Sequence, residues 1–347
     1  MLKTAEAVSL GHPDKISDYI SCYILDRMIE MDDCVKYAVE VMVKDNTVIL
    51  GGEITGNVNL SGVDEYVKNA LREIGYDERY CAIWGQYAID INKITVINLI
   101  GVQSPDINCG VQNNGWGDQG VFVGYACRGD DNINQELYLA RKLNRAIYDV
   151  ARVSNNLGLD IKTQITIDDC GNVETAIVAV PMRVPQDITE LIVDMLGERP
   201  KNIIVNGTGV YKYHSSVADC GITGRKLACD FYSTASPIGG GCPWTKDATK
   251  ADLTLNIYAR QLALDYLAEN DECFVCLSSC IGRAELPSGT IKTIKDGIAS
   301  ESNLFCNQSP DTLIKLFGLN RPIYTRLCTN GLASLRLTHT ETNRAIT

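Results

Sequence analysis

The chain has 347 residues, 45% of them hydrophobic, and a formal net charge of -11 at pH 7. Because no basic run stands out to neutralise phosphates, this balance argues against nucleic-acid binding. No apolar run long enough to span a membrane is present, and Lys3 and Glu6 interrupt the place where a signal-peptide core would form. We therefore expect a cytoplasmic protein of about two or three packed units, with no membrane partner.

The 14 cysteines are scattered through the chain without a paired framework. In a reducing compartment they are expected to be small buried hydrophobic residues. Cys273 and Cys276 form a CxxC pair, but they fall in a strand-like run over 272–280. Alternation along a strand sends residues three apart to opposite faces, so the pair is not expected to bind a metal.

Near the start of the chain an imidazole, a carboxylate and an ammonium group stand within four residues, as His12, Asp14 and Lys15. Pro13 suits the first position of a helix, and the apolar residues that follow recur at helical spacing. The pattern predicts a helix over 13–30. The positive end of its dipole favours an anion such as phosphate beside these three side chains. A polar helix cap without a further role is the alternative.

The rest of the chain repeats one order of elements, a helix followed by a hairpin and a second helix. In the first copy we expect a helix over 13–30, strands over 35–43 and 47–54, and a helix over 63–74 that ends at Gly75. In the second copy we expect a helix over 133–153, strands over 163–167 and 173–180, and a helix over 188–196. In the third copy we expect a helix over 250–268, strands over 273–279 and 290–294, and a closing helix capped by Ser309 and Pro310.

Three copies at a spacing of roughly 120 residues predict an α/β fold of the α+β type, with three similar helix–hairpin–helix units about a pseudo-threefold axis. Approximate boundaries are 1–104, 113–212 and 213–347, with the chain interlocked between units. Helices would cover one face of each sheet, and a second subunit is the natural cover for the other face.

A GxGxxG pattern runs from Gly115 to Gly120, but its surroundings differ from those of a dinucleotide-binding motif. A polar loop precedes it and a strand-like run over 121–125 follows it, whereas the motif needs a strand before and a helix after. NAD binding is therefore not expected, and no P-loop or kinase signature is present either.

Two other glycine-bearing segments carry cations and a carboxylate. One runs from Asp219 to Lys226, and the other begins with three glycines at 239–241 and continues through Lys246 and Lys250 to Asp252. Backbone N–H groups in such loops can approach an anion, and Asp252 offers the hard oxygen that Mg²⁺ binds. Lys246 and Lys250 share a helix face if the helix begins early. A solvated turn is the alternative for each segment.

Taken in order, these motifs resemble the S-adenosylmethionine synthetase (methionine adenosyltransferase) family over nearly the whole chain. The set comprises Gly-His-Pro-Asp-Lys at 11–15, Gly-Gly-Glu-Ile-Thr at 51–55, Gln-Ser-Pro-Asp-Ile at 103–107, Gly-Asp-Gln-Gly at 117–120, Lys-Thr-Gln at 162–164, Thr-Gly-Arg-Lys at 223–226, Gly-Gly-Gly at 239–241 with Lys-Asp at 246–247, and Arg-Pro-Ile-Tyr at 321–324. The interlocked three-unit fold of that family agrees with the repeat.

The resemblance implies that the sulfur of L-methionine attacks C5′ of ATP and displaces the triphosphate, which is hydrolysed to pyrophosphate and phosphate. A neutral thioether needs no general base. The charge that builds on the departing triphosphate needs fixed cations and Mg²⁺. K⁺ is a further expected cofactor.

The resemblance also implies a role for individual residues. Those expected to act on the triphosphate as it leaves are His12, Lys162, Arg225 and Lys246. Those expected to bind ATP or its adenosine are Lys15, Asp160, Tyr211, Asp219, Lys226 and Lys250. Those expected to receive methionine are Glu53, Gln103, Asp118 and Ile281. Asp14 and Asp252 would hold two Mg²⁺ ions, and Glu40 would hold K⁺.

The family builds each active site across a dimer interface, so the resemblance implies a homodimer or a dimer of dimers. Departures from the family pattern are Leu10 in place of a carboxylate, Val210 in place of an arginine, the segment 214–218 in place of glycines and a proline, and a shorter segment over 108–114. A non-catalytic nucleotide-binding paralogue or regulatory subunit is the alternative, but the retained charged residues favour an enzyme.

Overall fold

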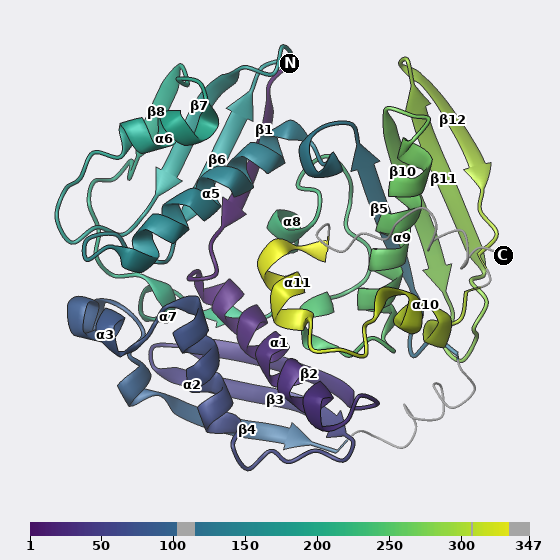
Figure 1. The fold of residues 1–347 in the computed structure, drawn as a ribbon, viewed down its shortest axis with the longest axis horizontal. Helices are drawn as coiled ribbons and strands as arrows, with labels where there is room; N and C mark the ends of the chain where they lie inside the picture. Colours follow the sequence, from purple (N-terminus) through teal and green to yellow (C-terminus); the bar gives the residue numbers. More distant parts are fainter. Residues whose placement is uncertain (103–114, 307, 333–347) are drawn as a thin grey trace.

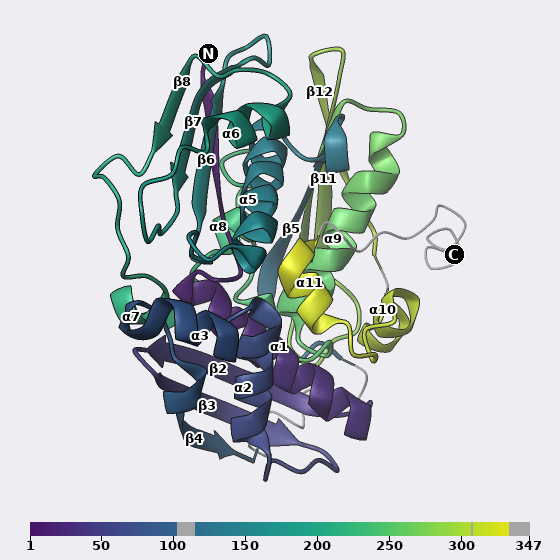
Figure 2. The same ribbon diagram turned by 60° about the vertical axis from the view of Figure 1, so that its left-hand side comes forward.

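The computed structural model describes residues 1–102, 115–306 and 308–332. The strands of these residues form three sheets of four strands each, which lie around a common centre in Figure 1. Figure 2 shows the same molecule after a turn of 60° about the vertical axis. One continuous cluster of buried apolar side chains extends through all three units. The predicted mixed α/β architecture is confirmed.

The first sheet has the strand order β4-β3-β2-β9. Its strands are β2 (Lys36–Lys44), β3 (Thr47–Thr55), β4 (Thr95–Gly101) and β9 (Gly221–Ile222). Helices α1 (Pro13–Met31) and α2 (Val63–Ile74) pack on one face, and α3 (Glu78–Trp84) follows α2. The other face carries exposed apolar side chains, as an uncovered sheet face does.

The second sheet has the order β1-β6-β7-β8. Its strands are β1 (Lys3–Val8), β6 (Lys162–Ile167), β7 (Val173–Ala179) and β8 (Asn202–Val205), and its helices are α5 (Gln135–Val153) and α6 (Thr189–Leu196). In both of these sheets a hairpin is followed by a helix and a parallel strand. The first two repeats therefore agree with the sequence pattern.

The third sheet has the order β12-β11-β10-β5 and is antiparallel throughout. Its strands are β5 (Gly120–Cys127), β10 (Glu272–Ser279), β11 (Ser288–Lys295) and β12 (Ile298–Asn303). Helix α9 (Ala251–Leu267) packs on β5 and β10. The approach is close at Gly124, where a Cβ atom would lie 1.9 Å from the Ala259 carbonyl oxygen. Here a meander replaces the hairpin, helix and parallel strand of the other two units.

Four further α-helices occur in the described part of the chain. They are α7 (Ser215–Ala218), α8 (Leu227–Asp230), α10 (Pro310–Phe317) and α11 (Tyr324–Asn330). Helix α11 packs against α1 near the centre of Figure 1, although some 300 residues separate their sequences. Among the described residues, no helix combines the length and apolar character that crossing a membrane requires.

Each sheet takes one edge strand from a distant part of the chain. Strand β9 pairs with β2, β1 pairs with β6, and β5 pairs with β10. The units are thus tied together by backbone hydrogen bonds as well as by side-chain packing. The linear boundaries near 104, 113 and 212 stay a prediction.

The 13 described cysteines are all free, which agrees with the absence of a disulfide framework. Cys273 is buried and Cys276 is exposed, so the predicted opposite orientation of this pair along β10 is confirmed. The expectation that the cysteines are buried is met by six of the 13, and the others are exposed or half-buried.

Candidate functional site

His12 immediately precedes α1, and Pro13 occupies the first turn as predicted. The imidazole Nδ1 accepts a hydrogen bond from the backbone N–H of Asp14 at 3.1 Å, which assigns the proton of the neutral ring to Nε2. Burial and the nearby ammonium of Lys226 lower the pKa of His12 to about 4. At neutral pH His12 is therefore an uncharged hydrogen-bond donor at the helix N-terminus.

The Asp14 carboxylate lies between α1 and the segment 221–226. Its Oδ1 accepts a hydrogen bond from the backbone N–H of Ile222 at 3.0 Å, and its Oδ2 accepts one from the ammonium of Lys226. The Arg225 Nε lies 3.5 Å from Oδ1. Gly221 permits this approach, because a Cβ atom there would lie 2.1 Å from the Pro13 carbonyl oxygen.

Asp252 repeats this arrangement at the start of α9. It is the second residue of α9, as Asp14 is the second residue of α1. Its Oδ1 accepts a hydrogen bond from the backbone N–H of Gly241 at 2.7 Å, and its Oδ2 pairs with the ammonium of Lys246. Two long helices therefore each begin with a carboxylate that binds one loop N–H group and one lysine.

Lys246 and Lys250 do not share a helix face. A shared face needs a helix that already includes Lys246, but α9 begins at Ala251. Lys250 is the N-cap residue of this helix, and Lys246 follows the short 3-10 helix Pro243–Thr245. Lys250 instead pairs with Asp247 and lowers the pKa of that carboxyl group, although burial opposes the shift. The lysines diverge because this turn precedes the helix and gives each its own carboxylate.

Glu40 lies between the two arrangements. Its Oε2 accepts a hydrogen bond from the Thr223 hydroxyl, and its Oε1 accepts one from the Thr245 hydroxyl at 3.0 Å. Thr223 belongs to the segment that carries Lys226, and Thr245 directly precedes Lys246. Glu40 therefore joins the two lysine-bearing loops and gathers hard oxygen atoms at one place.

Three residues predicted to act on ATP gather near His12. The charges of Lys162 and Asp219 both affect the pKa of His12, and both act on Asp160 as well. Asp160 Oδ2 accepts a hydrogen bond from the backbone N–H of Ser215 at 2.9 Å, and burial raises the pKa of Asp160 to about 7. This group forms a second polar wall beside the helix N-terminus.

Lys15 has a different environment from the other predicted ATP residues. Its side chain is 3% exposed, and the ammonium donates to both carboxylate oxygens of Asp230 at 2.9 and 3.0 Å. It also lies 3.2 Å from Asp18 and over the ring of Trp244. Burial alone would lower the pKa of Lys15, but the two carboxylates outweigh it and raise that pKa well above its ordinary value. The structure places Lys15 in a buried ion cluster.

Two of the residues predicted to receive methionine lie where the third sheet ends. The Asp118 carbonyl oxygen accepts a hydrogen bond from the Ser279 hydroxyl at 2.8 Å, and Ile281 bridges to Trp116. Ile281 is 49% exposed. Gln103 lies outside the described residues.

Glu53 and Tyr211 lie elsewhere around the site. Glu53 stands opposite Ala38 on the first sheet, and Ala38 in turn bridges to Lys246. One row across the sheet therefore leads from Glu53 to the lysine of the α9 arrangement. Tyr211 is half-buried, and its carbonyl oxygen accepts a hydrogen bond from the Met182 N–H at 2.9 Å.

Comparisons with known proteins give the same identification as the motifs. Residues 1–105 match the S-adenosylmethionine synthetase N-terminal domain, and residues 214–341 match the S-adenosylmethionine synthetase C-terminal domain. The S-adenosylmethionine synthase of Paramagnetospirillum magneticum is 31% identical over 363 residues, covering 95% of this chain and 92% of the relative. The S-adenosylmethionine synthase of Chlorobium phaeobacteroides is 31% identical over 367 residues, covering 92% and 89%.

The chain belongs to the S-adenosylmethionine synthetase family.

The fold agrees with this membership. The structure of an unusual S-adenosylmethionine synthetase from Campylobacter jejuni superimposes with a TM-score of 0.85 and 29% sequence identity, covering 95% of this chain and 94% of that chain. Leu10 is half-buried and packs against the apolar core.

Sequence reasoning missed the role of His214, which stands in the divergent segment 214–218. His214 is 1% exposed and packs among the rings of Tyr80 and Trp84. Its Nδ1 contacts the Lys212 carbonyl oxygen at 2.7 Å, which assigns a proton to Nδ1, and its Nε2 accepts from the Tyr80 hydroxyl. The buried ring thereby fixes the start of the segment, and the next residue donates the N–H group that binds Asp160. The one available signal was that this histidine follows Tyr211, a predicted substrate residue, by three positions.

The buried His214 makes the stability of this family member depend on pH. Burial lowers its folded-state pKa from 6.5 to about 4, so the unfolded chain binds more protons between these values and the fold loses stability as pH falls through them. We expect the wild type to lose on the order of 3 kcal/mol more than His214→Phe between about pH 7 and pH 4. Urea unfolding at both pH values measures the difference. Equal losses in the two proteins would contradict the assignment.

Proposed function

We propose that the chain synthesises S-adenosylmethionine from ATP and L-methionine. The methionine sulfur attacks C5′ of ATP, the triphosphate leaves, and it is hydrolysed to pyrophosphate and phosphate. Family membership supports this reaction, and the observation that carries it is the matched pair of carboxylate–lysine arrangements at Asp14 and Asp252. A leaving triphosphate needs cations fixed at several points along its length.

Lysines paired with carboxylates suit a site that must hold a polyanion only during turnover. In the free protein Lys226 and Lys246 are each neutralised by an aspartate. When the triphosphate binds, both ammonium groups turn to phosphate oxygens, with Arg225 as a third cation and Lys250 as a fourth. The four residues are then available to stabilise the charge that develops on the leaving group.

The two carboxylates that lose their lysine partners in this exchange are suitable ligands for Mg²⁺. Asp14 and Asp252 would each supply one carboxylate, and Mg²⁺ is commonly bound by one or two carboxylates together with substrate phosphates and water. In the described part of the chain, clusters of three metal-binding side chains occur in the turns at 32–34 and 168–170, so the site itself has no all-protein cage. The bound ions would neutralise the triphosphate.

Glu40 fits the expected K⁺ ion. Its carboxylate and the hydroxyls of Thr223 and Thr245 offer hard oxygen atoms at one point. A cation there would neutralise Glu40 and keep the two lysine-bearing loops at a fixed separation.

His12 would act as a hydrogen-bond donor rather than as a base. Its Nδ1 is occupied by the helix N–H, so the Nε2 proton is available to the bridging oxygen as that oxygen gains charge. Lys162 begins β6, its side chain is about half exposed, and it would assist His12 at the same oxygen. The thioether sulfur is neutral and carries no proton that must be removed, so the proposed reaction needs no residue to act as a general base.

The substrate groups on either side of the reacting atoms would be held by the remaining predicted residues. Asp160 and Asp219 would contact the adenosine, and Tyr211 would stack on the adenine ring. Glu53 would pair with the methionine ammonium, while Asp118 and Ile281 would enclose the rest of the amino acid.

The partner proposed for the chain is a second copy of itself. Ile222, Met42, Ile49 and Ile97 are consecutive in one register row across the first sheet, on the face away from α1. The exposed fractions are 37% for Met42 and Ile222, 42% for Ile97 and 65% for the adjacent Leu99. A contiguous exposed apolar face of this kind is typical of a protein interface. Glu53 lies on the same face, so an active site shared between subunits would form at its margin.

The first experiment is to incubate the purified chain with ATP, L-methionine, Mg²⁺ and K⁺ and to follow the products by mass spectrometry. We expect S-adenosylmethionine with pyrophosphate and phosphate. Undiminished binding of ATP without any product would contradict the enzyme assignment and support the nucleotide-binding paralogue.

Replacing the ammonium groups beside the triphosphate should lower turnover sharply without unfolding the protein. Lys162→Met and Lys246→Met, made separately, should each lower kcat by about 100-fold or more, since each removes a charge aimed at the leaving group. Lys201→Met serves as a matched control, because Lys201 is an exposed lysine that pairs with Glu174. Wild-type kcat in both site variants, with thermal melting unchanged, would overturn the residue assignment.

Dilution tests the shared active site. If residues of two subunits complete each site, activity per chain should fall as the protein dissociates, and sedimentation should show the dimer-to-monomer transition over the same concentrations. Constant turnover per chain in a sample shown to be monomeric would exclude the shared site.

A further inference from the structure

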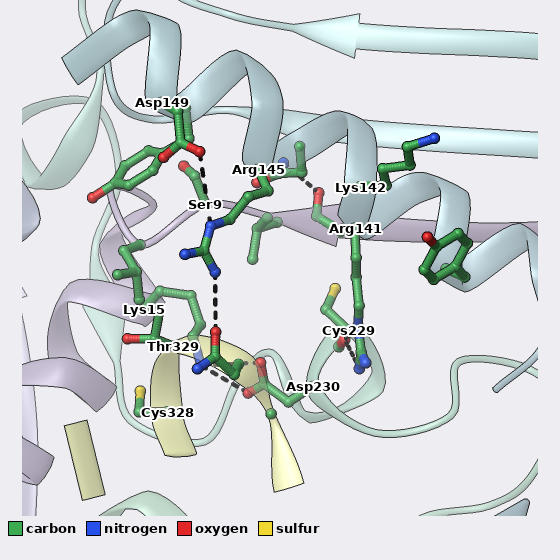
Figure 3. A pocket seen from close by; sticks show the side chains of 18 of the residues that line it. Ser9, Lys15, Arg141, Lys142, Arg145, Asp149, Cys229, Asp230, Cys328 and Thr329 are labelled. Atoms are coloured by element: carbon green, nitrogen blue, oxygen red, sulfur yellow. Dashed lines mark hydrogen bonds and ion pairs between the residues drawn. The ribbon is translucent and has the colours of Figure 1, made fainter. Parts of the chain in front are cut away.

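A cavity of about 580 Å³ lies between α5, β1, α8 and the end of α11. Figure 3 shows it from close by, with the side chains of α5 on one side and the segments around Cys229 and Thr329 on the other. Its volume is within the range of pockets that take small molecules. Of the site residues predicted from sequence, Lys15 alone is among the described residues that line it.

The lining is positive although the protein is acidic. The cationic side chains around the cavity are Lys15, Arg141, Lys142, Arg145 and Arg152. Against these five cations stand three carboxylates, those of Asp131, Asp149 and Asp230. The formal charge of the lining is therefore positive, whereas the whole chain carries -11. A cavity of one sign concentrates ligands of the opposite sign.

The cations form a stripe on one helix. Arg141, Arg145 and Arg152 are spaced by four and seven residues, which places them on the same face of α5. Figure 3 shows Arg141 and Arg145 extending from the helix toward Cys229 and Thr329. Two guanidinium groups one helical turn apart, those of Arg141 and Arg145, can bind several oxygen atoms of one anion, because each presents a planar set of donors.

These guanidinium groups are weakly neutralised by the protein. Arg141 donates to the carbonyl oxygens of Cys229 and Phe231, and no carboxylate of the described residues lies within ion-pair distance of it. Burial lowers the pKa of Arg141, and the charges of Asp230 and Asp131 oppose this shift without outweighing it. Arg145 lies 3.9 Å from Asp149 and donates to the Asn330 side chain at 3.0 Å.

We propose that this cavity is a second anion site, separate from the active site, which binds a small ligand carrying two or more phosphoryl groups. Arg145 and Arg141 bind the phosphoryl oxygens from α5. The Arg145 side chain is exposed, so a ligand can reach it from solvent. Its 3.9 Å contact with Asp149 is an exposed ion pair, which contributes little free energy, and a phosphoryl group can therefore replace it. The floor of the site is the Lys15–Asp230 ion pair, adjacent in sequence to Asp14.

Calorimetric titration of inorganic pyrophosphate into the full chain tests the proposal. We expect two classes of site per chain in the wild type. Lys226→Met should weaken the active-site class, and Arg145→Gln should weaken the other class by about tenfold while leaving the first unchanged. Arg145→Lys should retain part of the binding. Arg199→Gln removes the same charge from an exposed position and should change neither class.

The proposal is overturned if Arg145→Gln binds pyrophosphate as the wild type does, or if Lys226→Met removes all binding. Arg145 is exposed, so its substitution should leave the fold intact, and Arg141→Gln gives a second test in the more buried position. Since binding is measured without turnover, failure of S-adenosylmethionine synthesis would leave this result unaffected.

Discussion

The pairing of a carboxylate at a helix start with a lysine from a distant loop underlies the whole site. Asp14 and Lys226 are 212 residues apart, yet the carboxylate is 1% exposed and its two oxygens are bound by a backbone N–H and an ammonium. A buried carboxylate is costly unless it is paired in this way, so the loop and the helix are held at one separation. Asp252 and Lys246 form the same kind of pair at the start of α9. The same pairs that stabilise the free protein thus keep two carboxylates and two lysines ready for a metal-bound polyphosphate.

Interlocking of the sheets makes this pairing possible. Gly221 and Ile222 form β9, a two-residue strand on the edge of the first sheet, and Ile222 also donates the N–H group that binds Asp14. The first sheet therefore carries the loop of a later unit to the start of α1. The Lys15–Asp230 pair makes a second connection between the same helix and α8, and it forms the floor of the basic cavity. At both places the contact that joins two distant segments is also a contact to a charged side chain.

Helices and hairpins were predictable where local signals agreed. Pro13 and the apolar spacing located α1, and alternation with compact turns located β2–β3 and β6–β7. Strand β12 was missed because its sequence, Ile-Ala-Ser-Glu-Ser-Asn, has no alternation, and all six residues are exposed. Strand β9 was missed because two residues carry no periodic pattern, and only the neighbouring β2 makes them a strand. The third copy keeps the predicted helix, the paired strands β10 and β11 and the closing helix capped by Ser309, and it differs from the prediction in the added antiparallel strand β12.

The sequence by itself determined the chemistry available to this protein. It placed a histidine, a carboxylate and a lysine at a helix start, it placed glycine–cation loops near two further aspartates, and their order identified the family. Only the tertiary structure decided which side chains form ion pairs with one another. It paired Lys226 with Asp14, it separated Lys246 from Lys250, and it placed Lys15 with Asp230 rather than with the other predicted ATP residues. Local periodicity reports on neighbours within a few residues, whereas ion pairs and buried rings such as His214 depend on which distant segments the packed core brings together.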